Sequence, residues 1–346
     1  SFIPTSRYTF KRATGLVEQD MKIKGNSPRY IQEMTKLVQP DTYIGRFWGG
    51  LSVESITSRT WDDYKKWLRK QTDDQGLEPH HQKTIHQFKV AVQRVLKSAY
   101  LAKWIKDVPK FQDVDKPLGH DSTPRMSFNE DELRKLYKAS RKNIALKKSE
   151  NKKRYAQALE LHDFIVWMAN TGMRPGEAMQ LRFKDIRILK KVERHCIYGE
   201  ERDYDVCMTT IIGGKRGQHP ECRSWVFAPG AYKRRIAARG IKNPETSEEK
   251  LFLESHRNMF RNLLEAEGLY KDNYDRKRDF VSLRATYINF QLDFGANVWN
   301  IATNTRTSVG VIEKHYAKYR RSANTINRFK RIPEDEEDWE NSSIFT

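Results

Sequence analysis

Residues 170–178 read Asn-Thr-Gly-Met-Arg-Pro-Gly-Glu-Ala, and this stretch decides how the rest of the chain is interpreted. It places Arg174 in a turn that opens a helix, with Glu177 following in the same helix. Far downstream, Arg284 lies in the sequence Ser-Leu-Arg-Ala-Thr, and Tyr316 follows a Thr-Ser-Val-Gly stretch. Two arginines that can bind a phosphate and one late tyrosine that can attack it form a set suited to phosphoryl transfer.

The composition indicates a polyanionic partner. The chain has 346 residues, which suggests two domains, and 64 Lys and Arg against 45 Asp and Glu give it a formal charge of +19. A chain this basic gains affinity for nucleic acid by releasing the counterions of the phosphates. A membrane surface is the rival partner, but the sequence contains neither a basic amphipathic anchor nor a long apolar run. We therefore expect nucleic acid rather than a membrane.

The cysteines are too few for a disulfide framework. Cys196, Cys207 and Cys222 include no Cys-x-x-Cys pair, which also argues against a structural zinc site. An odd number of cysteines and the lack of a visible signal peptide favour a reducing compartment. We expect a cytoplasmic protein that needs no metal and no other cofactor.

Breaks in the hydrophobic pattern divide the chain into five parts. Residues 1–20 show no clear period and are interpreted as an N-terminal extension or arm, whereas residues 21–115 show the periodicity of a helical domain. The composition of 116–125 marks a linker, residues 126–332 form the second and larger domain, and 333–346 make an acidic tail. We predict a mainly α fold with a small β-sheet in the second domain.

A helix predicted over residues 84–103 has two contrasting faces. Apolar residues recur along one face at helical spacing, and basic residues lie along the other. The basic residues are Lys83, Lys89, Arg94, Lys97 and Lys103. Such a face is compatible with a solvated surface, but in a chain with a formal charge of +19 it is also suited to contact DNA phosphates.

The small β-sheet is expected as a hairpin. Residues 206–212 are rich in β-branched side chains, 213–217 read Gly-Gly-Lys-Arg-Gly and turn the chain, and 223–227 alternate as the returning strand. This arrangement puts Lys215 at the tip of the hairpin, with Arg216 beside it.

Taken in order, these features resemble a tyrosine recombinase of the phage-integrase type over residues from about 25 to 331. The shared order is a helical core-binding region, a linker, Thr-Gly-Met-Arg-Pro-Gly-Glu, a β-hairpin lysine, Ser-Leu-Arg, and a tyrosine nine residues after the Thr of Thr-Ser-Val. The resemblance implies a two-domain clamp around double-stranded DNA, four protomers on paired DNA sites, and strand exchange without ATP or metal. It also implies integration or excision of a phage or other mobile element in a bacterial host, with possible help from accessory DNA-bending proteins.

The resemblance implies a role for each residue of the motifs. Tyr316 would be the nucleophile, since a phenol that attacks a backbone phosphorus forms a covalent 3′-phosphotyrosyl link, which stores the bond energy for rejoining. Arg174 and Arg284 would bind the non-bridging oxygens, because a guanidinium is planar, charged and bidentate toward phosphate. Glu177 would orient the site, and Lys215 would protonate the leaving 5′-oxygen.

The sequence departs from the pattern of that family at three positions. The histidine expected three residues before the second arginine is replaced by Val281, which can neither move a proton nor donate a hydrogen bond. Ala285 stands where a histidine is common, and the later His-or-Trp position is Thr307, preceded by Arg306 instead of glycine. Thr307 still offers a hydroxyl donor to phosphate, and Ser282 or a water molecule remains as a candidate base.

Alternatives remain open for the function and for the tail. Val281 and Thr307 also fit a DNA-binding or architectural relative with impaired catalysis, and a relaxing topoisomerase would share the cleavage chemistry. The acidic tail 333–346 either docks onto a neighbouring protomer or acts as a solubilising segment. Arg216 is the alternative to Lys215 at the hairpin tip. The basic residues predicted to contact DNA are Lys89, Arg94, Lys97, Arg216 and Arg306.

Overall fold

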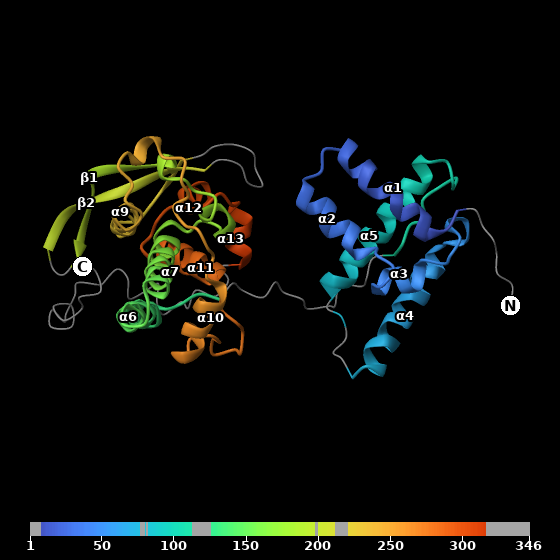
Figure 1. The fold of residues 1–346 in the computed structure, drawn as a ribbon, viewed down its shortest axis with the longest axis horizontal. Helices are drawn as coiled ribbons and strands as arrows, with labels where there is room; N and C mark the ends of the chain where they lie inside the picture. The colour runs from blue at the N-terminus through green and yellow to red at the C-terminus, as the bar shows by residue number, and fades with distance from the viewer. Residues whose placement is uncertain are drawn as a thin grey trace. The chain divides into compact units, whose positions relative to one another are not determined.

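The computed structural model describes residues 8–76, 80, 82–112, 126–197, 200–211 and 221–315, without the side chains of 193–202. The chain divides into two compact units, residues 1–120 and 121–346 (Figure 1). Both are built mainly from helices and the second also contains a small antiparallel sheet, so the predicted fold class is confirmed. The predicted linker, 116–125, spans the division between the units and lies outside the described residues.

The described part of the first unit is entirely helical. Its elements are α1 (Phe10–Ile23), α2 (Pro28–Leu37), α3 (Tyr43–Trp48), a 3-10 turn at Val53–Ser55, α4 (Ser58–Asp74) and α5 (Gln82–Leu101). In neither unit does a helix of the described residues combine the length and the apolar character that a membrane crossing needs.

Helix α1 corrects the expectation of an extension or arm over residues 1–20. Its buried residues are Phe10, Ala13, Val17 and Met21, which recur at helical spacing and belong to the core of the first unit. The buried stripe contributes about one residue per turn, and polar or charged residues occupy most of the positions between. So narrow a stripe is hard to distinguish in the sequence, and packing against α5, α2 and α3 stabilises the helix.

Aromatic side chains fill the core of the first unit. Trp48 of α3 and Trp61 and Tyr64 of α4 are fully buried. The rings of Trp61 and Phe111 stack with their centroids 5.2 Å apart, and those of Trp48 and Tyr64 lie 5.4 Å apart. Large rings in contact contribute both buried area and specific ring–ring attraction. The first unit therefore has a hydrophobic core of its own.

The second unit combines helices with a three-stranded sheet in its described part. Its helices are α6 (Glu130–Lys148), α7 (Lys152–Thr171), α8 (Pro175–Ala178), α9 (Ala228–Arg239), α10 (Arg257–Ala266), α11 (Phe280–Asp293), α12 (Val298–Asn304) and α13 (Val309–His315), with 3-10 turns at Phe183–Asp185 and Pro244–Thr246. Its strands are β1 (Ile186–Ile197), β2 (Glu200–Thr210) and β3 (Glu221–Arg223).

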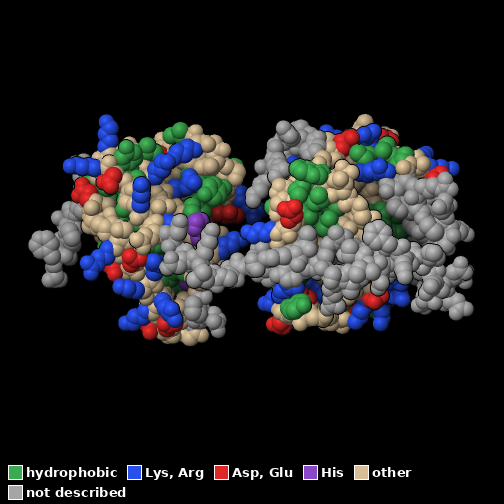
Figure 2. Space-filling view, turned by 180° about the vertical axis from the view of Figure 1, so that it is seen from behind, with side chains coloured by type: hydrophobic (Ala, Val, Ile, Leu, Met, Phe, Trp, Pro, Cys, Tyr) green, Lys and Arg blue, Asp and Glu red, His purple; other side chains and the backbone are tan. Residues whose placement is uncertain are grey.

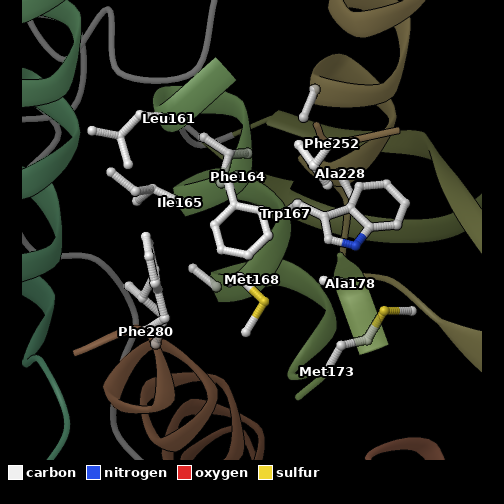
Figure 3. Packing of buried hydrophobic residues seen from close by; sticks show 14 of the residues in the cluster. Leu161, Phe164, Ile165, Trp167, Met168, Met173, Ala178, Ala228, Phe252 and Phe280 are labelled. Atoms are coloured by element: carbon white, nitrogen blue, oxygen red, sulfur yellow. The ribbon is translucent and has the colours of Figure 1, made fainter. Parts of the chain in front are cut away.

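Helix α7 is the central element of the second unit. It contacts α6, α9 and α11, and nearly every residue of its second half is buried. The ring of Phe164 meets Phe252 and Phe280 edge-on, at centroid distances of 4.9 and 4.8 Å (Figure 3). A helix buried on all sides is fixed in position by its neighbours. The C-terminal end of α7 can therefore present the residues that follow it, from Gly172 onward, in a defined place.

The sheet has one more strand at its start than the sequence predicts, and its last strand is shorter than predicted. The strands pair antiparallel in the order β1-β2-β3, and most of 206–212 lies in β2 as expected. Strand β1 was not predicted, because charged residues interrupt it and a register shift between Leu189 and Glu193 breaks its alternation. The expected returning strand 223–227 is wrong in extent, since β3 ends at Arg223 and α9 begins at Ala228.

Ionisable side chains are buried on α7 next to its apolar residues. Nδ1 of His162 and Oγ of Ser140 are 2.8 Å apart, and burial lowers the pKa of His162 to about 3. Burial raises the pKa of Asp163 to about 6, although Nε of Arg234 donates to its Oδ1 at 2.7 Å. His162 is therefore neutral in the folded protein across the physiological pH range.

The buried histidine predicts a specific loss of stability in acid. Below the usual histidine pKa of about 6.5, the unfolded chain binds a proton at this histidine and the folded protein does not. The free energy of unfolding therefore falls as pH falls. Between pH 7 and 5 this contribution amounts to about 2 kcal/mol. Chemical denaturation at both pH values should show that His162→Gln loses about 2 kcal/mol less than wild type.

Two features make this measurement specific for His162. Asp163 acts in the opposite direction, since its raised pKa favours the folded state as pH falls, so only the difference between variant and wild type isolates His162. His86→Gln, at an exposed position, is the matched control and should leave the wild-type difference unchanged. An identical acid loss in His162→Gln and wild type would contradict the prediction.

Candidate active site

The turn that carries Arg174 is set by a glycine at the end of α7. Gly172 has a φ of +62°, and its N–H donates to the carbonyl oxygen of Met168 at 3.1 Å, which ends the helix. A Cβ at position 172 would lie 2.3 Å from Cδ1 of Tyr287, so the position requires glycine on two grounds. Pro175 then opens α8, since a proline suits the first position of a helix.

Arg174 and Glu177 form the first part of the site. The backbone N–H of Arg174 donates to Oε2 of Glu177 at 3.2 Å, and Nη1 of Arg174 donates to Oε1 at 2.9 Å. Nη2 of Arg174 donates to the carbonyl oxygen of Arg306 at 2.8 Å. The side chain of Arg174 is 38% exposed and that of Glu177 only 9%. The guanidinium is therefore fixed by two partners and remains accessible to a ligand.

Arg284 reaches the same turn from α11. Its Nη1 donates to the carbonyl oxygen of Gly172 at 2.6 Å, and the residue is almost fully buried. The helix that carries it is capped at Asp279, whose side chain accepts the N–H of Val281 and whose backbone N–H donates to Oγ of Ser282 at 3.1 Å. Ser282 thus has a capping role that the sequence did not indicate, and Val281 is half-buried.

Arg306 and Thr307 follow the end of α12. The N–H of Arg306 donates to the carbonyl oxygen of Thr303 at 3.1 Å. The N–H of Thr307 donates to the carbonyl oxygen of Ala302 at 2.9 Å. These two hydrogen bonds form a Schellman motif, in which the residue after the cap adopts a left-handed conformation. Arg306 occupies that place with a φ of +55°. Both Arg306 and Thr307 are buried.

Within the described residues, two guanidinium groups contact the carboxylate of Glu177, and a third binds the backbone of the same turn. Nη1 of Arg306 lies 3.4 Å from Oε1 of Glu177, the oxygen that also accepts from Arg174. Arg284 joins these residues through its hydrogen bond to the carbonyl oxygen of Gly172, two residues before Arg174. Fixed guanidinium groups are suited to bind a tetrahedral oxyanion and to stabilise charge that develops on it.

Asn304 connects this cluster to the sheet. Its Oδ1 accepts the backbone N–H of Arg223 at 2.7 Å, and its Nδ2 donates to the carbonyl oxygen of the same residue at 2.9 Å. Nδ2 also lies 2.9 Å from the hydroxyl of Tyr287. One side chain therefore joins the end of β3, helix α11 and the end of α12. No local sequence pattern marks this residue, because its partners Arg223 and Tyr287 lie far away along the chain.

The two described cysteines form no disulfide and belong to no group of side chains that could bind a metal ion. Cys207 and Cys222 are free and buried, and burial raises the pKa of each thiol to about 12. Among the described residues, no group of three His, Cys, Asp or Glu side chains could bind a metal ion. The thiols are therefore inert components of the core.

Several predicted site residues fall outside the described part of the chain. Tyr316, Lys215 and Arg216 are among them, so their roles stay predictions. The residue before Tyr316, His315, ends α13, and Ile312 of the same helix is fully buried.

The predicted basic face of α5 is only partly exposed. Lys97 is exposed, but Lys89 is 7% exposed and belongs to the buried side of the helix, which corrects its assignment to a solvent-facing surface. Arg94 is half-buried, and its guanidinium lies 5.3 Å from the ring centroid of Tyr30 and donates to Asn26 at 3.4 Å. Elsewhere, the face of the first unit seen in Figure 2 carries many Lys and Arg side chains and few acidic ones.

Comparisons with known proteins bear on the fold. No protein-family model matches the chain, and no curated protein matches it. The chain is similar to the solved structure of the Tn1549 transposon integrase in complex with circular intermediate DNA, with a TM-score of 0.56, 15% identity, and coverage of 94% of this chain and 100% of that chain. A lambda integrase dimer bound to a COC′ core site gives a TM-score of 0.59 at 13% identity, with 90% and 96% covered.

A third structure is similar to the same extent. XerH site-specific recombinase bound to its difH substrate gives a TM-score of 0.55 at 13% identity, covering 95% of this chain and 99% of that one. Identities this low carry information about architecture only. The resemblance to integrases and recombinases expected from the sequence is confirmed for the fold.

The glycine that shapes the turn can be tested against another in the same conformation. Gly240 ends α9 with a φ of +63°, and a Cβ there would meet no described atom within 4 Å. Gly240→Ala should therefore cost only the backbone term, about 1 kcal/mol. Gly172→Ala adds the clash with Tyr287 and should cost about 3 kcal/mol in the free energy of unfolding.

Urea unfolding of both variants measures the difference. If the two substitutions cost the same, the close approach of Tyr287 to Gly172 does not constrain the turn.

Proposed function

We propose that the protein is a site-specific DNA recombinase that cleaves and rejoins DNA through a covalent 3′-phosphotyrosyl intermediate. The observation that carries this proposal is the convergence of Arg174, Glu177 and Arg284 at one turn, although the last is separated from the others by over a hundred residues. The convergence occurs in a fold shared with integrases and recombinases. In addition, Tyr316 follows directly after α13 in the sequence.

The arginines would bind the scissile phosphate and stabilise the transition state. Attack on a phosphodiester produces a pentavalent phosphorus with additional negative charge on its non-bridging oxygens. Arg174 is suited to this role because its guanidinium is fixed by Glu177 and by the carbonyl of Arg306, yet is partly exposed. Groups that are fixed before the substrate arrives need no reorganisation during the reaction.

The bonds that form and break, and the proton donor to the leaving group, can be assigned. The phenol oxygen of Tyr316 would form a bond to phosphorus while the bond to the 5′-oxygen breaks, and Lys215 would protonate that oxygen as it leaves. The phosphotyrosyl ester keeps the energy of the broken bond, so rejoining by a DNA 5′-hydroxyl needs no ATP. Val281 has no group that accepts a proton, so the phenolic proton would pass to water or to another group near the site.

DNA and other copies of this chain are the proposed partners. The formal charge of +19 favours a polyanion, and the similar Tn1549, lambda and XerH structures are complexes with DNA. We include in the proposal a homotetramer on paired sites, help from accessory DNA-bending proteins, and a role for a phage or mobile element in the cytoplasm of a bacterial host. A clamp of the two units around the duplex belongs to the same proposal.

A second candidate function is a DNA-binding relative with impaired catalysis. Val281 favours it, because it replaces a side chain that could take part in proton transfer. The intact set of Arg174, Glu177, Arg284 and Tyr316 opposes it. A relaxing topoisomerase would share the cleavage step but would act on a supercoiled plasmid without pairing two sites.

A nicked suicide substrate tests the proposed cleavage directly. Duplexes carrying the candidate site, or nicked genomic fragments, are incubated without metal and separated on a denaturing gel. Wild type should give a slow-migrating covalent protein–DNA band and Tyr316→Phe should give none, because the phenol oxygen is the attacking atom. Arg284→Ala should form the band at least about 100-fold more slowly, because one charge-stabilising group is lost.

The outcomes of this assay separate the candidate functions. Tight binding of the DNA by both wild type and Tyr316→Phe without any band would contradict the recombinase and favour the binding protein. A band accompanied by plasmid relaxation that depends linearly on protein concentration would favour the topoisomerase.

Helix α5 offers a separate test of DNA binding. Lys97 is exposed, so Lys97→Gln should weaken binding equally on unrelated sequences and reduce the slope of log affinity against log salt by about one. Lys97→Arg, which keeps the charge, should retain the wild-type slope. Fluorescence anisotropy over a range of salt concentrations measures both, and an unchanged slope in Lys97→Gln would remove Lys97 from the interface.

A further inference from the structure

Arg306 occupies a backbone position that favours glycine. Its φ of +55° lies in the left-handed region, where a Cβ approaches the following carbonyl oxygen. The hydrogen bonds from Arg306 to Thr303 and from Thr307 to Ala302 keep it there, because they complete the end of α12. A large side chain in this conformation is strained, and strain of this kind is commonly found where a side chain has a function.

The backbone carbonyl and the guanidinium of Arg306 both contact residues of the proposed phosphate site. Its carbonyl oxygen accepts a hydrogen bond from Nη2 of Arg174 at 2.8 Å. Its Nη1 lies 3.4 Å from Oε1 of Glu177, which in turn accepts from Nη1 of Arg174. Arg306 therefore closes a ring of contacts with Arg174 and Glu177 from the far end of α12.

Burial distinguishes this residue from a surface contact to DNA. The side chain of Arg306 is 4% exposed, whereas that of Arg174 is 38% exposed. Its guanidinium contacts the buried carboxylate of Glu177 and does not form part of the exposed surface. It can act on the exposed guanidinium of Arg174 through the carboxylate that the two arginines share.

We propose that Arg306 is a positioning residue of the phosphate site, which fixes Arg174 through Glu177 and raises the positive charge of the site at a cost in backbone strain. This inference rests on the proposed function for its kinetic consequence. Arg174 and Arg306 both contact the carboxylate of Glu177, and Arg284 binds the carbonyl oxygen of Gly172 at the same turn. Their mutual repulsion falls when an oxyanion enters, so the site is arranged for an anion before one arrives.

This arrangement predicts that substitutions can separate the backbone strain of Arg306 from the charge of its side chain. Arg306→Gly keeps the backbone carbonyl that binds Arg174 and relieves the left-handed strain, but it also loses the contact with Glu177 and leaves a cavity. Its thermal unfolding midpoint should therefore exceed that of Arg306→Ala, which makes nearly the same truncation and keeps the strain. Arg306→Gln keeps the strain and loses the charge, so it separates the backbone contribution from the electrostatic one.

The experiment measures anion binding and DNA cleavage in the same set of proteins. Orthovanadate, a tetrahedral oxyanion, should raise the unfolding midpoint of wild type and should raise those of Arg306→Gly and Arg306→Gln much less. Covalent complex formation at saturating nicked DNA should slow about 10- to 100-fold in both variants, as for other groups that orient a reacting side chain. The DNA dissociation constant should change less than about threefold, because the side chain is buried.

A double-mutant cycle identifies the route by which Arg306 acts. If it works through Glu177, the double variant Arg306→Gln/Glu177→Gln should cleave no more slowly than the slower single variant. Arg261→Gln is the matched control, since it removes one exposed arginine from the second unit and should change neither the vanadate shift nor the cleavage rate.

The outcomes keep this inference apart from the proposed function. Cleavage at the wild-type rate by Arg306→Gly and Arg306→Gln would overturn the inference and leave the recombinase intact. A vanadate shift that depends on Arg306, in a protein that cleaves no DNA, would support the charged site and overturn the recombinase. Multiplicative losses in the double variant would also overturn the inference, because Arg306 would then act independently of Glu177.

Discussion

The carbonyl oxygen of Gly172 is the point on which the candidate site depends. It accepts the hydrogen bond of Arg284, and its direction follows from the left-handed conformation of a residue that the ring of Tyr287 prevents from having a side chain. The buried helix α7 fixes this turn from one side, and Arg174 leaves it on the other. The positions of both arginines are thus consequences of how one apolar helix packs and ends.

Much of the site was predictable because its chemistry requires particular residue types in order. Arg174, Glu177 and Arg284 stand out in the sequence, and the structure brings them together. The fold class was predictable for a similar reason, since long amphipathic segments with few β-branched runs favour helices. The order of the motifs indicates which residues belong to the site, but it does not give the distances between them.

The features that the sequence did not predict depend on contacts between distant segments. Helix α1 is stabilised by packing on α5, and the burial of Lys89 depends on which side of α5 faces the core. Arg306 lies beside Glu177 because the chain makes a left-handed turn at this residue. The sequence does not indicate that turn, because glycine is the usual residue at such a position. Tertiary packing decided each of these cases, and local propensity did not.

The link between β3 and α12 implies an asymmetry in which substitutions the protein can accept. Asn304 binds the backbone N–H and carbonyl of Arg223, so these two hydrogen bonds do not depend on the side chain at position 223. Asn304 itself must supply an acceptor and a donor at once, and aspartate offers only acceptors when ionised. The link between these two residues therefore survives many substitutions at position 223 and few at position 304, although they are in direct contact.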